Sequence, residues 1–193
     1  MSGANTYDGP TVVSGGTLLI NGDHSLATGG ITVAAGAVVG GSGTLGGALT
    51  VNGTFAPGTN PGTMTTSGAV TFNAGSVLNY ELVGNDFTVG GAVNDLLTGV
   101  SNLTLGGTLN VTEIGVGSFA GAVEGNTWRL MNYTGTLTGA LALGTTPGLS
   151  GGRSFEVTAG GGQVNLVVVP EPTTTVTLLA GLGLLLGRRR RRA

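Results

Sequence analysis

The stretch Gly46-Gly47-Ala48-Leu49-Thr50-Val51 decides the fold, because a corner of small residues is followed by alternating apolar and polar side chains. Variants of this unit occur at residues 15–20, 29–33, 67–72 and 106–111. Their apolar runs are short, contain β-branched residues and are bounded by small residues, mostly glycine, a pattern typical of short β-strands. Each unit is therefore predicted to contribute one strand to a repeating, all-β structure.

The spacing of these units indicates a solenoid. The first four begin at positions 15, 29, 46 and 67, and these irregular offsets are close to one coil of a stacked repeat. Stacked coils would pair strand on strand, bury the Val, Leu and Ile side chains, and place glycine at the corners. We expect a right-handed parallel β-helix, with an antiparallel β-sandwich as the alternative that the same short strands allow.

Composition narrows the function classes. Glycine supplies 40 of the 193 residues, charged residues make up 8%, and the sequence contains neither lysine nor cysteine, whereas a typical soluble domain is about 25% charged. Such a chain has no basic face for nucleic acid, no disulfide framework and few groups for acid–base chemistry. Five of its seven arginines form the run Arg188, Arg189, Arg190, Arg191 and Arg192, so positive charge is concentrated in one terminal segment.

The N-terminal part resembles a known repeat family. Residues 5–22, from Asn-Thr-Tyr-Asp-Gly to Leu-Leu-Ile-Asn-Gly, are similar to the autotransporter-associated β-strand repeat. Residues 36–47 and 55–62 resemble the glycine-rich and Ala-Pro-Gly stretches of the same passenger regions. The resemblance implies a right-handed β-helical passenger that is secreted or exposed on a bacterial surface.

The C-terminal segment has three parts. A Pro-Glu-Pro motif comes first, formed with the preceding valine by Val169, Pro170, Glu171 and Pro172. The prolines end the preceding strand and favour an extended, accessible peptide. An apolar run and the arginines follow, and this order predicts a short transmembrane helix with a cytoplasmic basic tail. The apolar residues assigned to the helix are Val176, Leu178, Leu179, Ala180, Leu182, Leu184, Leu185 and Leu186.

This tripartite tail is similar to the PEP-CTERM protein-sorting signal. That resemblance implies an exosortase-type sorting enzyme as a partner, with Pro170, Glu171 and Pro172 as recognition residues of a substrate. It also implies a chain that is transiently anchored in the bacterial inner membrane, is cleaved near the motif, and reaches the cell surface or extracellular matrix.

Catalytic candidates are few. His24 is the only histidine, and we expect it in a polar turn, because its neighbours Asp23 and Ser25 cannot form a triad with it. We expect the pairs Asn85-Asp86 and Asn94-Asp95 to be turns and Trp128 to lie in the core. The acids that stand singly in the sequence are Asp86, Asp95, Glu113, Glu124 and Glu156. An enzyme would require at least two of these to share a cleft.

The sequence thus predicts a non-enzymatic envelope protein without cofactor or metal site. Residues 1–113 are assigned to β-helix repeats, 114–169 to coils that close the solenoid, and 170–193 to the sorting signal. The expected role is structural, in the cell envelope or extracellular matrix. The alternative is a surface adhesin or polysaccharide-binding module, with exopolysaccharide as a candidate partner and no nucleic acid.

Overall fold

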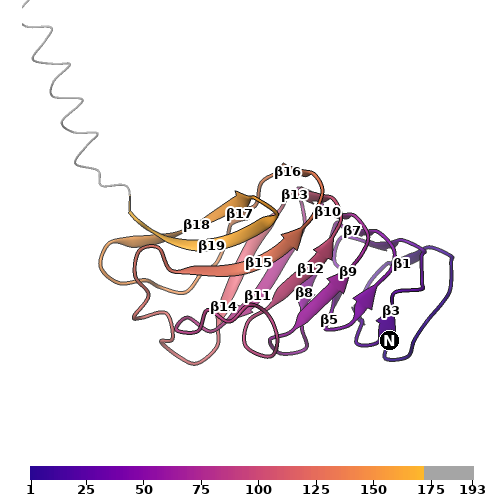
Figure 1. Cartoon of the computed structure of the whole chain (residues 1–193), viewed down its shortest axis with the longest axis horizontal. Helices are drawn as coiled ribbons and strands as arrows, with labels where there is room; N and C mark the ends of the chain where they lie inside the picture. The colour runs from indigo at the N-terminus through magenta and orange to yellow at the C-terminus, as the bar shows by residue number, and fades with distance from the viewer. Residues whose placement is uncertain (172–193) are drawn as a thin grey trace, which may run out of the picture.

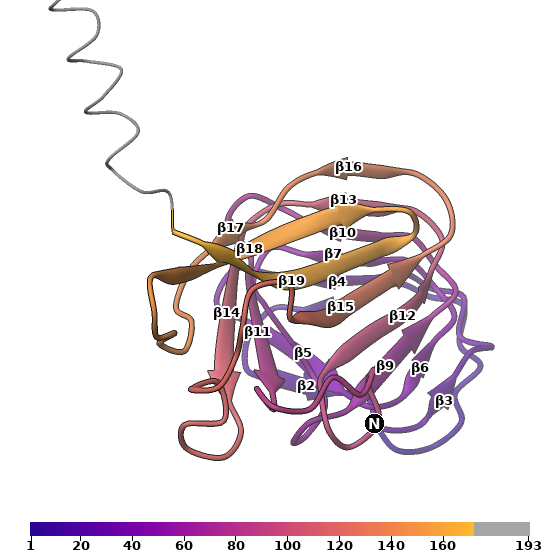
Figure 2. The ribbon, with the colours of Figure 1, turned by 60° about the vertical axis from the view of Figure 1, so that its left-hand side comes forward.

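The computed structural model describes residues 1–171 and has three β-sheets wound from successive strands of the chain (Figure 1). Up to β17, every third strand joins the same sheet, so three strands and their corners make one coil. Figure 2 shows the three sheets as sides of the stack, with β18 and β19 at its C-terminal end. The sheets are parallel except at that end, which favours the solenoid over the antiparallel sandwich.

The strands are grouped by sheet as follows. Sheet A contains β1 (Thr11–Val13), β4 (Ile31–Val33), β7 (Leu49–Val51), β10 (Val70–Phe72), β13 (Leu103–Leu105) and β16 (Leu137–Gly139). Sheet B contains β2 (Thr17–Leu19), β5 (Val38–Gly41), β8 (Thr54–Pro57), β11 (Val77–Leu82), β14 (Thr108–Glu113) and β17 (Ala142–Leu143). Sheet C contains β3 (Asp23–His24), β6 (Thr44–Leu45), β9 (Thr63–Thr66), β12 (Leu96–Val100), β15 (Thr127–Tyr133), β18 (Arg153–Gly160) and β19 (Gln163–Pro170).

Strand register shows that the coils lengthen along the chain. Along sheet A, Thr11 pairs with Ile31, Ile31 with Leu49, and Leu49 with Val70, so these coils have the length of a short solenoid repeat. Val70 pairs with Leu103 and Leu103 with Leu137, so the next two coils are considerably longer. The added residues lie mainly between β11 and β12 and between β14 and β15.

The prediction that the five sequence units are equivalent is wrong. The units at 29–33, 46–51 and 67–72 enter sheet A, but those at 15–20 and 106–111 enter sheet B. Thr17 accordingly pairs with Val38, and the offset between positions 15 and 29 is not a coil. Strands of both sheets A and B begin after a corner of small residues and alternate buried with outward side chains. The local pattern therefore does not identify the sheet to which a unit belongs.

The core lies between the three sheets and follows the alternation of each strand. Leu49 and Val51 are buried while Thr50 faces outward, and the same holds for Val70 and Phe72 around Thr71. Outward threonines of sheet A stand in register along the stack, namely Thr32, Thr50, Thr71, Thr104 and Thr138. Apart from exposed Val12 on β1, this outward row of sheet A is therefore polar and uncharged.

Glycines are stacked at the corner that leads into sheet A. A Cβ added to Gly29 would overlap the carbonyl oxygen of Gly9, one on Gly47 that of Gly29, and one on Gly68 that of Gly47. These three glycines have no positive φ, so the requirement here is close backbone approach between coils. The expectation that glycine occupies the corners is confirmed at this glycine column, which comprises Gly9, Gly29, Gly47 and Gly68.

Alanine in the glycine column is expected to destabilise the protein. Gly47→Ala forces its Cβ against the backbone of the preceding coil, and such overpacking costs about 1–3 kcal/mol. Gly75→Ala is the matched control, because its Cβ enters open space and loss of unfolded-state freedom stabilises by about 0.4–1 kcal/mol. Urea unfolding followed by circular dichroism measures both, and equal midpoints for the two variants would contradict the role of the column.

Candidate functional site

A groove of about 630 Å³ lies over the outer face of sheet B. Buried Leu78, Tyr80 and Leu82 alternate with Asn79 and Glu81 along β11, so the latter two point outward. The groove crosses β2, β5, β8, β11 and β14. Adjacent strands are about 4.8 Å apart, so it runs roughly 20 Å parallel to the solenoid axis.

Small residues shape the floor of this groove and larger ones its sides. Gly40 and Ala56 are paired neighbours on β5 and β8, and a Cβ on Gly40 would overlap the Ala56 carbonyl oxygen. Thr17, Leu19 and Val38 border the N-terminal side, whereas the C-terminal side is lined by Asn79, Glu81, Asn110, Thr112 and Thr145. One end is thus mainly apolar and the other mainly polar.

Two asparagines form a hydrogen-bonded ladder at the polar end. The Asn110 Nδ2 amide donates to Asn79 Oδ1 at 3.1 Å, and Asn110 Oδ1 accepts the Thr145 backbone N–H at 2.9 Å. Asn79 is exposed and Asn110 half-buried. The ladder therefore presents oriented amide groups along the axis, which suit hydroxyl-rich ligands.

Asp95 fixes the corner of the groove between sheets B and C. Its side chain is 1% exposed, Oδ1 accepts the Gly62 N–H and Oδ2 accepts the Glu81 N–H, both at 2.8 Å. Burial raises the pKa of Asp95 to about 7 against the opposing effect of these two hydrogen bonds. Burial, and secondarily the Asp95 charge, also raises the pKa of Tyr80 well above its ordinary value.

The electrostatic character of the groove is acidic. Glu81 and Asp95 both line it, and among its lining residues in the described part of the chain none is basic. Arg129 is engaged elsewhere, since it donates to Asn165 and Asn132, each at 2.7 Å. Because the raised pKa of Asp95 keeps it largely protonated below pH 7, the uncompensated negative charge that an anionic ligand would meet there comes from Glu81. The groove therefore favours neutral or cationic ligands.

The predicted catalytic candidates lie in different environments. His24 is in β3 and 2% exposed, with Nδ1 accepting from the Asn5 amide at 2.8 Å, so its expected place in a polar turn is wrong. Asp86 does form a turn, and its Oδ1 accepts the Thr88 N–H. The Asn94 side chain accepts the Val83 N–H and donates to the carbonyl oxygens of Asp86 and Thr88. Asn94 and Asp95 are thus both buried and do not form a simple exposed turn.

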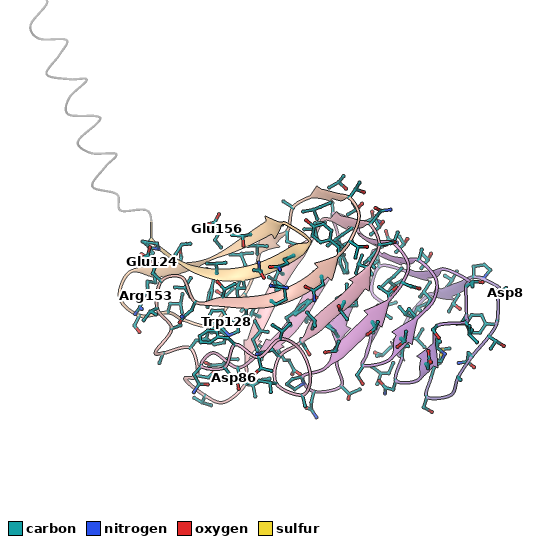
Figure 3. All side chains as sticks on the ribbon, in the orientation of Figure 1. Asp8, Asp86, Glu124, Trp128, Arg153 and Glu156 are labelled. Carbon is teal, nitrogen blue, oxygen red and sulfur yellow. The ribbon has the colours of Figure 1, made fainter. Side chains whose placement is uncertain are left out.

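The acidic residues that stand singly in the sequence do not share a cleft in the structure. Of that set only Asp95 lines the groove, and the second acid there is Glu81, which the sequence does not single out. Figure 3 shows Asp86, Glu124, Glu156 and Arg153 toward the end formed by the antiparallel hairpin of β18 and β19, opposite Asp8. Within residues 1–171 there is no group of three or more His, Cys, Asp or Glu residues that could hold a metal ion.

Trp128 lies in the core, as predicted. It is 1% exposed, and its Nε1–H donates to the Val83 carbonyl oxygen at 3.0 Å. Its ring centroid lies 4.9 Å from that of Phe119, 5.1 Å from Phe87 and 6.1 Å from Phe155. We call Phe87, Phe119, Trp128 and Phe155 the aromatic cluster, and it closes the C-terminal end of the stack.

The sorting residues are divided by the limit of the described chain. Val169 and Pro170 are the last residues of β19, and Glu171 follows. Pro172, the apolar residues assigned to a transmembrane helix and the five terminal arginines lie outside the described residues. In the part that is described, no helix has the length and apolar character needed to cross a membrane.

Comparison with known proteins finds two similarities. Residues 168–192 match the family described as the PEP-CTERM protein-sorting motif. Over 118 residues, 60% of its length, the chain is 47% identical to the adhesin BmaC autotransporter of Brucella suis biovar 1 (strain 1330). It spans 3% of that much longer protein. The chain therefore carries a C-terminal PEP-CTERM sorting motif and a region similar to part of an autotransporter adhesin.

Proposed function

We propose that this protein is an exported surface adhesin that an exosortase sorts through its C-terminal signal. The observation that carries the proposal is the combination of the motif at residues 168–192 with 47% identity to part of an adhesin. That relative supports adhesion over a purely structural role in the matrix. It also supports a non-enzymatic function, because adhesion requires binding alone.

The parts of the chain take separate roles in this proposal. Residues 1–113 form a right-handed β-helix, residues 114–169 close it, and residues 170–193 form the signal. Right-handed winding agrees with the strong preference of crossover connections between parallel strands. Pro170, Glu171 and Pro172 are the recognition residues, residues 176–186 span the inner membrane transiently, and Arg188 to Arg192 stay cytoplasmic.

The groove on sheet B is the ligand site of the proposed adhesin. A linear polysaccharide lying along the axis would contact successive strands, with hydroxyls on the Asn79–Asn110 ladder and apolar sugar faces near Leu19 and Val38. The acidic lining supports a neutral polysaccharide or one with cationic amino sugars. The envelope exopolysaccharide is a candidate partner if it has that chemistry.

A glycan array probed with the mature protein tests this assignment. We expect retention by neutral or amino-sugar polysaccharides and about fivefold weaker binding for Asn110→Ala, because loss of the ladder costs about 1 kcal/mol. Thr71→Val on sheet A and Glu156→Gln on β18 are matched controls, because both lie outside the groove.

Three outcomes would contradict the proposal. One is the absence of glycan retention, and another is equal loss of binding in the Thr71→Val control. The third is the release of new sugar chain ends during incubation, which would indicate enzymatic cleavage of the polysaccharide.

A further inference from the structure

The sorting motif begins inside the folded sheet. The family match starts at residue 168, whereas β19 extends to Pro170. Strand β19 lies between β18 and β15 and is antiparallel to both. Residues 168–170 are therefore both part of the signal and part of the closing strand (Figure 2).

The backbone of this overlap is held from two sides. On one side the Gly125 N–H donates to the Val168 carbonyl at 2.9 Å, and the Val168 N–H donates to the Asn126 carbonyl at 3.0 Å. On the other side β18 pairs Ser154 with Val169 and Arg153 with Pro170. Just beyond the strand, the Glu171 N–H donates to the Gly152 carbonyl at 2.9 Å.

Burial changes abruptly along these residues. Val164, Leu166 and Val168 are each 0% exposed and pack in the core, whereas Pro170 and Glu171 are exposed. A peptide must leave its own sheet before it can lie extended in the active site of another protein. Cleavage at or before Val169 would therefore require that Val168 leave the core and lose its backbone hydrogen bonds.

We propose that the hairpin of β18 and β19 stays paired up to Val169 during sorting and sets the mature C-terminus at Pro170 or later. This inference rests on the proposed processing by an exosortase. The enzyme engages exposed Pro170 and Glu171 once their bonds to Arg153 and Gly152 open, and cleavage is a hydrolysis at or after the Pro170–Glu171 bond. The carbonyl carbon gains the hydroxyl of water, and the released segment gains an amine. The paired hairpin keeps the peptide bonds that precede Pro170 out of the active site of the enzyme.

Mass spectrometry of the mature surface protein tests the proposal directly. The full chain is produced in an exosortase-containing host, and its last residue is identified by top-down fragmentation. We expect an end at residue 170 or later. An end at or before Val169 would overturn the hairpin proposal while leaving sorting intact. An uncleaved Ala193 would overturn both, because processing itself would be absent.

A cross-linked hairpin provides a second test. Ser154→Cys with Val169→Cys joins paired positions in a chain that has no cysteine of its own, so only one disulfide can form. We expect the same processed fraction and C-terminus as in the two single variants, with the disulfide verified by mass. Precursor that accumulates only in the oxidised double variant would show that β19 must open, and would overturn the proposal.

Discussion

Replacing Trp128 by alanine is expected to lower the free energy of unfolding by about 3–5 kcal/mol, the range found for large aromatic residues removed from cores. The indole is 1% exposed and contacts three other rings of the aromatic cluster. Its loss leaves a cavity between β15, the 83–95 segment and the hairpin. It also leaves the Val83 carbonyl oxygen without its indole donor.

Trp128→Phe separates packing from hydrogen bonding. Phenylalanine keeps an aromatic ring in the cluster but lacks the donor to Val83, so we expect a smaller loss of about 1–2 kcal/mol. Chemical denaturation monitored by far-ultraviolet circular dichroism compares both variants with the native protein. An alanine variant as stable as the native protein would contradict the assignment of the cluster as the C-terminal core.

Stability is expected to fall as pH rises from about 4 to 7, because of Asp95. Its pKa is raised from 3.8 to about 7 in the folded protein, so in this range the native state binds a proton that the unfolded state has released. The stabilising contribution is complete below pH 4 and is lost as pH rises through 7. About 3 pKa units correspond to about 4 kcal/mol.

Asp95→Asn is expected to remove this pH dependence. The amide cannot ionise, although it keeps only one acceptor for the Gly62 and Glu81 N–H groups, so the variant is less stable than the native protein at pH 5. Asp86→Asn is the control, since a hydrogen bond from Thr88 lowers the pKa of Asp86 and its titration lies below this range. Urea titrations at pH 5, 6, 7 and 8 measure the slopes, and a persistent slope in Asp95→Asn would assign it to another group.

Much of the fold could be predicted from local pattern alone. The alternation around Thr50 and the tight glycine corners follow from rules that hold within one short segment. The sheet that a unit joins is determined by pairing with a strand one coil away. The local pattern therefore aligns the unit at 15–20 with the unit at 29–33, whereas Thr17 pairs with Val38. The antiparallel turn into β19 likewise depends on pairing with β15, which is distant in the sequence.

The sequence predicts less of the candidate site than of the fold. Asn79, Glu81 and Asn110 carry no distinctive motif, and they meet only because β11 and β14 are paired residue for residue. Asp95 resembles a turn residue in sequence because its two hydrogen-bond donors lie 14 and 33 positions away. The one available signal was the outward position of Asn79 and Glu81 between buried residues of a single strand.

The aromatic cluster makes the two ends of the stack unequal. Apart from His24, the buried side chains of the first two coils are aliphatic, whereas aromatic contacts begin at Phe55 and Phe72 and continue to Phe155. In a stacked repeat each coil contacts only its neighbours, so the first coils can open while the last stay closed. A protease would thus trim the protein from the β1 end. Such trimming would shorten the stack of coils and leave the aromatic cluster intact.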